Sequence, residues 1–166
     1  MIFKRVNRRA LVAAATIGLI LATPRFSGQN AKATPQKEVS PVCSIAISEP
    51  LPGDRVGAGS TVSGTAKIPA KSHLWILSHK KTFNGWWPQG SGETPVDGGT
   101  WAVDVYYGVD SDHGNFEIAV IAVSESVNND LNNWVDTSSK KGSYPPIKFP
   151  SVVDGCPIAR VTVVKP

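Results

Sequence analysis

Residues 73–89 combine an unusually apolar strand pattern with a loop that contains two adjacent tryptophans. Side chains alternate between the two faces of a strand. Trp75 and Leu77 share one face of this segment. Leu74 and Ile76 share the other face, so both faces are apolar. We therefore predict a strand that is buried on both sides, in the middle of a sheet or between two layers.

Other short alternating segments, separated by turn residues, predict a protein built mainly of strands. Residues 116–123 are apolar on both faces apart from Glu117, and we predict that they lie beside the Trp75 strand. Six or seven short strands with turns between them favour a β-sandwich. The other predicted strands cover residues 43–48, 60–68, 100–107 and 158–164.

The pattern changes before the last predicted strand. Val127, Leu131 and Val135 recur at the spacing of one helix face. We predict a short amphipathic helix here, because apolar residues at this spacing can pack against a sheet even though asparagine-rich sequence is a poor helix former. Residues 137–150 contain polar residues and prolines and are predicted to form a loop.

The N-terminal residues have the pattern of a secretory signal. A basic segment at 4–9 precedes an uncharged apolar run at 10–22. This run is shorter than the roughly 20 residues of a stable membrane span, so cleavage is favoured over anchoring. We predict a signal peptide at 1–33, a linker at 34–42 and one folded domain at 43–166, which is secreted or periplasmic and has no membrane span. A twin-arginine signal and an earlier cleavage site stay open as alternatives.

The charge of the whole chain gives a misleading picture of the folded domain. The chain has a net charge of +4, but six of its 17 lysine and arginine residues precede Thr34, where no acidic residue occurs. The remaining 11 basic residues face 13 acidic ones, which gives a net charge of −2. Nucleic-acid binding needs a basic surface, so we exclude a nucleic-acid partner.

Residues 50–66 resemble the opening of bacterial immunoglobulin-like domains of secreted and envelope proteins. A proline-rich loop leads there into a strand of the form V-x-G-x-A, at Val62 to Ala66. The resemblance implies an all-β, immunoglobulin-like sandwich of about seven strands. The short helix before the last strand is predicted from the apolar spacing instead, and residues 124–155 depart from the minimal pattern of these domains. Further similar landmarks are Leu74-Trp75, Trp86-Trp87-Pro88-Gln89, Gly99-Thr100-Trp101 and Phe116-Glu117-Ile118.

The resemblance also bears on the two cysteines. Cys43 opens the first predicted strand and Cys156 precedes the last. These strands commonly run close together in immunoglobulin-like folds, and an exported protein meets an oxidising compartment. We therefore predict a disulfide between the two cysteines, with two free thiols as the alternative.

The tryptophan loop is the best candidate for a binding site. Flat aromatic faces suit stacking on sugar rings, and the same groups can anchor a protein partner. A loop that folds back over the end of the sandwich as part of the core is the competing interpretation. Trp75, Trp101 and Trp134 are predicted to be core residues. The candidate binding residues are Trp86 and Trp87, with Lys81, Asn84 and Gln89 as hydrogen-bonding groups.

Metal and catalytic signals are weak by comparison. Residues 110–117 partly resemble a calcium loop, but a polar hairpin turn explains them better. His73 and His79 share a strand face yet are about 20 Å apart along it, too far to bind one metal ion. The chain has no G-x-S-x-G, P-loop or H-E-x-x-H motif. A carboxylate pair such as Asp104 and Glu117 is the one catalytic arrangement that we keep as an alternative.

These patterns together predict an exported, non-catalytic interaction module at the cell envelope, without a metal or cofactor. Its partner is an envelope protein or a glycan. A carbohydrate-binding module is the first alternative, and a small secreted hydrolase is the second. Two exposed, coplanar indoles in the tryptophan loop would favour the glycan partner, and buried indoles would favour a structural or protein-facing loop.

Overall fold

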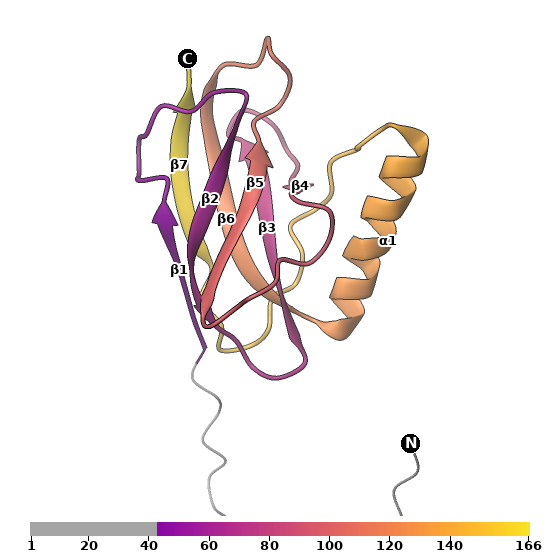
Figure 1. Cartoon of the computed structure of the whole chain (residues 1–166). Helices are drawn as coiled ribbons and strands as arrows, with labels where there is room; N and C mark the ends of the chain where they lie inside the picture. The colour runs from indigo at the N-terminus through magenta and orange to yellow at the C-terminus, as the bar shows by residue number, and fades with distance from the viewer. Residues whose placement is uncertain (1–42) are drawn as a thin grey trace, which may run out of the picture. The chain divides into compact units, whose positions relative to one another are not determined.

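The computed structural model describes residues 43–166, and the predicted signal peptide (1–33) and linker (34–42) lie outside the described residues. The strands form two antiparallel sheets, with the orders β1-β2-β5 and β4-β3-β6-β7 (Figure 1). The elements are β1 (Ser44–Glu49), β2 (Gly59–Lys67), β3 (Ser72–Lys80), β4 (Trp87–Pro88), β5 (Thr100–Tyr106), β6 (Gly114–Ser124), α1 (Glu125–Lys141) and β7 (Ala159–Lys165).

The main core fills the space between the two sheets. It is built from the inward-facing, mostly aliphatic residues of both sheets, in line with the alternation expected of a sandwich. β3 is paired with β6 along its whole length, with Trp75 opposite Ile121. The predicted pairing of the two doubly apolar strands is confirmed. Fully buried members of this core include Val62, Ile76, Val105, Ile118 and Val163.

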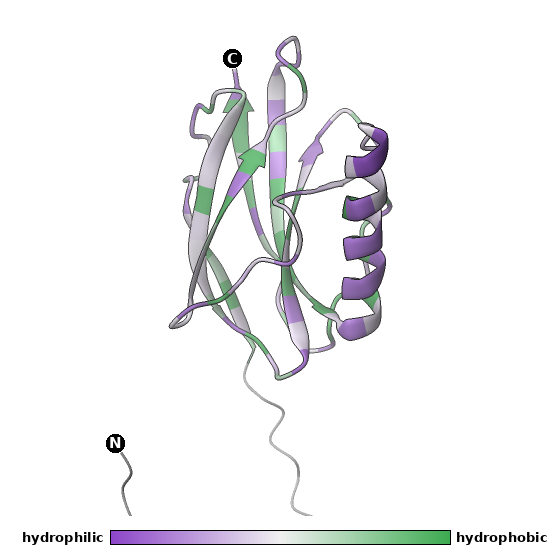
Figure 2. Ribbon diagram, turned by 45° about the vertical axis from the view of Figure 1, so that its right-hand side comes forward, coloured by the Kyte–Doolittle hydropathy of each residue, from purple (hydrophilic) through white to green (hydrophobic). Residues whose placement is uncertain are grey.

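A second apolar layer explains why β3 and β6 are apolar on both faces. Trp75 and Leu77 of β3 pack with Ile121 of β6 and with Leu131 of α1. The helix, which is largely hydrophilic, covers the outer face of the larger sheet (Figure 2). The indole Nε1 of Trp75 donates a hydrogen bond of 2.9 Å to Asn128 Oδ1, which satisfies the buried N–H group.

The helix is longer than the sequence pattern predicts. It extends to Lys141, so the loop predicted from residue 137 begins only after the helix ends. Ser124 caps the N-terminus, and Gly142 ends the helix in a left-handed conformation with φ of 61°. These caps and the lysines in the last turn compensate for the weak helix propensity of the asparagine-rich sequence.

The predicted disulfide is present. Cys43 and Cys156 are bonded, with their Cα atoms 5.1 Å apart. The bond joins the residue before β1 to the segment that leads into β7, and these two strands contact each other. It therefore ties the smaller sheet to the larger one. Within residues 43–166, no helix has the length and apolar character needed to cross a membrane.

Candidate functional site

An open groove with a volume of about 1010 Å³ runs between β5 and the chain around β4. Segments that are distant in sequence supply its lining: the end of β3 with the turn after it, β4 and β5 with the loops after them, one residue of β6, one side chain of α1 and one residue of the loop after the helix. Its walls carry Phe83, Trp87, Tyr106, Trp134 and Tyr144. Phe83, Tyr106 and Tyr144 are 57%, 67% and 53% exposed, which is unusual for so many large rings at one place. We call this feature the aromatic groove.

Hydrogen bonds hold the two tryptophans of the aromatic groove in place. Trp87 Nε1 donates to the carbonyl of Tyr144 at 2.9 Å, and Trp134 Nε1 donates to the carbonyl of Pro145 at 3.1 Å. The ring centroids of Phe83 and Trp87 are 6.1 Å apart, and those of Trp134 and Tyr144 are 5.9 Å apart. Both pairs are tilted, so the groove presents ring faces and edges on a largely preformed surface.

The two adjacent tryptophans of the loop lie in different surroundings. Trp87 lines the groove, whereas Trp86 packs against the helix-side core. Trp86 stacks on His79 with a centroid distance of 4.6 Å, and the guanidinium of Arg160 lies 5.2 Å from its ring centroid. Neighbouring residues of an extended chain point to opposite faces, which explains the separation. The pair is therefore not a coplanar platform.

The three hydrogen-bonding residues predicted beside the tryptophans also separate. Gln89 is buried, and its Nε2 donates to Ser78 Oγ at 2.8 Å while its Oε1 accepts from the backbone N–H of Tyr106 at 2.8 Å. The side chain thus connects the two sheets and holds the groove together. Lys81 and Asn84 lie exposed in the turn after β3, outside the groove lining.

The charged groups of the groove have partners within the protein. Lys80 Nζ lies 2.6 Å from Asp112 Oδ1, and the other oxygen of Asp112 accepts from the backbone N–H of Val109 at 2.9 Å. The hydrogen bond from Lys80, together with that from Val109, lowers the pKa of Asp112. Asp112 therefore stabilises the polar turn before β6. No cluster of three potential metal ligands occurs in the part of the chain that the structure describes.

The carboxylate pair kept as a catalytic alternative is divided between the two sheets. Asp104 belongs to β5 and accepts a hydrogen bond of 2.8 Å from Thr61 Oγ1. Glu117 belongs to β6 of the other sheet and forms an ion pair with Arg160. Each carboxylate has its own partner. Asp104 lines the aromatic groove, and Glu117 does not.

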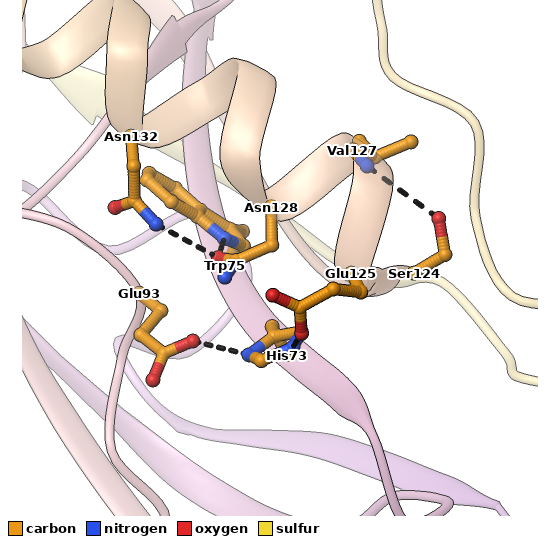
Figure 3. A network of polar contacts seen from close by, with 8 residues as sticks. All are labelled: His73, Trp75, Glu93, Ser124, Glu125, Val127, Asn128 and Asn132. Carbon is orange, nitrogen blue, oxygen red and sulfur yellow. Dashed lines mark hydrogen bonds and ion pairs between the residues drawn. The ribbon is translucent and has the colours of Figure 1, made fainter.

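A histidine connects the groove to the helix (Figure 3). His73 contacts Glu93 through Nδ1 and Glu125 through Nε2, the latter at 2.7 Å. Glu93 lines the groove, and Glu125 is the first residue of α1. A neutral imidazole has a single N–H, so two carboxylate partners require the protonated ring. Partial burial lowers the pKa of His73, but its contacts with Glu125 and Glu93 together raise it above its ordinary value.

This histidine is expected to make stability depend on pH. Because its pKa is higher in the folded than in the unfolded protein, its contribution is fully present below the unfolded pKa of about 6.5 and is lost as pH rises through the folded pKa. The glutamates are largely exposed, so the contribution is at most about 1 kcal/mol. The measurement is thermal unfolding of wild type and His73→Gln from pH 5 to pH 9. The stability difference should shrink with rising pH, and a constant difference would contradict the assignment.

Most of the groove residues are missed by sequence reasoning. Trp75 and Trp101 are buried as predicted, but Trp134 is only partly buried and lines the groove, so its assignment to the core is wrong. A signal for Tyr106 does exist in the sequence, because this large ring falls on the polar strand face of Asp104. The positions of Phe83 and Tyr144 depend on tertiary packing, and the alternation of residues along a strand does not predict them.

The chain matches no known protein family, and it matches no curated protein. The function is therefore inferred from the aromatic groove and its surroundings.

Proposed function

We propose that this protein is an exported, non-catalytic binding module with an immunoglobulin-like fold, whose binding site is the aromatic groove. Support for the fold comes from the strand order. The first, second and fifth strands share one sheet, and the third, sixth and seventh share the other. Strands A, B and E and strands C, F and G divide in the same way in immunoglobulin domains. The fourth strand joins the second group, like the extra strand C′ of variable-type domains.

Export is supported from two directions. The disulfide between Cys43 and Cys156 is typical of proteins that fold in an oxidising compartment. The basic residues followed by an apolar run at the N-terminus are typical of a secretory signal. A secreted or periplasmic location at the cell envelope accounts for both features.

The cluster of exposed aromatic rings is the observation that carries the binding function. Preformed concave surfaces with aromatic anchors and few polar groups are the usual form of binding sites. The groove is partly open, and its Asp112 and Glu93 already have partners in Lys80 and His73. Carboxylates that are already paired suit recognition better than acid–base chemistry. An envelope polypeptide is the partner that we propose.

Removal of two groove rings tests this function. A Phe83→Ala/Tyr106→Ala variant is expected to lose binding by about tenfold or more, since aromatic anchors contribute at least 1–2 kcal/mol at interfaces. Binding is measured on arrays of synthetic peptides and of envelope glycans. Leu51→Ala is the matched control, because Leu51 is equally exposed but lies outside the groove lining. Equal binding by the double variant and the control would refute the groove as the site.

Glycan binding is the second candidate function. The exposed rings of Tyr106 and Tyr144 can stack on sugar faces. The separation of Trp86 from Trp87 removes the paired-indole platform that favours this alternative most. Binding to the glycan array alone, with the same loss in the double variant, would establish it.

A further inference from the structure

The aromatic groove runs along the outer edge of β5, which is the last strand of its sheet. In an antiparallel sheet, alternate residues direct their N–H and C=O groups to opposite sides. The N–H of Tyr107 bonds to the carbonyl of Ala58, next to β2, at 2.9 Å. Tyr106, Asp104 and Ala102 therefore direct their backbone groups away from β2, toward the groove that they line.

The two ends of this edge are already closed by the protein itself. At one end, Thr100 exchanges two backbone hydrogen bonds of 2.9 Å with Asp97. At the other end, the N–H of Tyr106 donates to Gln89 Oε1, and its carbonyl accepts from Ser78 Oγ at 3.3 Å. The side chains of Ser78 in β3 and of Gln89 after β4 thus occupy the place of a neighbouring strand.

The middle of the edge is open. On the side away from β2, Ala102 and Asp104 have no backbone hydrogen bond to any residue of 43–166. Two N–H donors and two carbonyl acceptors are unpaired there, on residues about 7 Å apart. An unpaired strand edge of this kind is a template for pairing with another chain.

We propose that an extended segment of a partner polypeptide adds to β5 as a short antiparallel strand, with one residue paired to Ala102 and another paired to Asp104. Four backbone hydrogen bonds form, because each antiparallel pair of this type exchanges both of its N–H···O bonds. The side chains that flank the paired residues contact the rings of the aromatic groove. This inference rests on the proposed function and specifies the partner of the same site.

Charge selects the partner's side chain opposite Asp104. This carboxylate is exposed, whereas the nearby Lys80 is neutralised by Asp112. Opposite charges across a strand pair are favourable and like charges are unfavourable, so the partner carries a lysine or arginine at this position. The same rule disfavours a second copy of β5 in the register that sets one Asp104 against the other.

The experiment uses peptides of about ten residues that alternate valine and threonine, with a central lysine, glutamate or glutamine. Affinity is measured by titration with the disulfide-bonded domain, and amide hydrogen exchange is followed by NMR. The lysine peptide is expected to bind most tightly and to slow exchange at the amides of Ala102 and Asp104. Ala102→Pro removes one free donor and blocks the edge without loss of a bond to β2, so binding should fall by about tenfold or more.

Two further variants complete the test. Ala102→Val keeps the backbone donor, so it should bind the lysine peptide more tightly than Ala102→Pro does. Asp104→Lys should reverse the preference from the lysine peptide to the glutamate peptide, which a merely unfolded variant would not do. The two amides could instead be protected in the absence of peptide, with a dimer seen in sedimentation. That result would mean that a second copy of the domain pairs with β5, and it would overturn the proposal.

The remaining outcomes separate this inference from the proposed function. Peptide binding that is lost in Phe83→Ala/Tyr106→Ala but retained in Ala102→Pro would overturn strand addition and leave the groove as the binding site. Failure of every peptide to bind would also overturn strand addition, while glycan binding that depends on Tyr106 would still support the groove.

Discussion

Replacement of Cys43 and Cys156 by serine is expected to lower the free energy of unfolding by about 4–5 kcal/mol. The two residues are 113 positions apart in sequence, so their bond closes most of the domain into one loop. In the chain-entropy model a loop of this length gives one of the largest effects that a disulfide can have. Small domains have a total stability of about 5–15 kcal/mol, so the loss is a major fraction.

Urea unfolding followed by tryptophan fluorescence measures this loss. The wild-type protein reduced with a thiol reagent should match the double serine variant, because both lack the same covalent bond. The slope of the free energy against urea should also rise, since the unfolded chain exposes more surface without the cross-link. A loss below about 1 kcal/mol would show that the unfolded chain gains little freedom when the loop opens.

Substitution of Trp75 by alanine is expected to cost about 3–5 kcal/mol of stability. The indole is completely buried between the outer face of the larger sheet and α1. Its loss leaves a cavity and also removes the donor that bonds to Asn128. The helix, whose sequence has little propensity of its own, should be the element most affected.

Trp75→Phe serves as the matched control for this prediction. Phenylalanine keeps a large ring but lacks the Nε1 donor, and Asn128 Oδ1 still accepts from Asn132 Nδ2 at 3.3 Å. We expect an intermediate loss of stability for this variant. Hydrogen exchange should show faster opening of α1 than of β2 in Trp75→Ala. Uniform acceleration across all elements would contradict a helix-specific effect.

Much of the sandwich can be predicted from the sequence because its signals are local. The two strands that are apolar on both faces lie side by side, as the pattern of residues 73–79 and 116–123 predicts. Their second apolar face has its physical cause in the helix, which covers it. The apolar spacing does not mark the end of that helix, and the signal for it is Gly142 after two lysines.

The candidate site is less accessible to such reasoning. Gln89 is a polar residue in a loop-like sequence, which favours an exposed hydrogen-bonding group, yet the fold uses it to connect two sheets. Trp86 and Trp87 are neighbours in sequence, but strand alternation sends them to different layers. Phe83, Tyr106 and Tyr144 come together only when the turn after β3, β5 and the loop after α1 are placed. Local patterns contain no information on that placement.

The disulfide also determines how the domain responds to mechanical force. A pulling force applied through Cys43 and Pro166 passes along the covalent bond to Cys156 and then through β7, and it bypasses the 112 residues from 44 to 155. Only the ten residues after Cys156 can be stretched, and their full length is about 35 Å. The groove-forming strands β4 and β5 lie inside the bypassed loop. Tension between these two points therefore loads β7 and not the strands that form the groove.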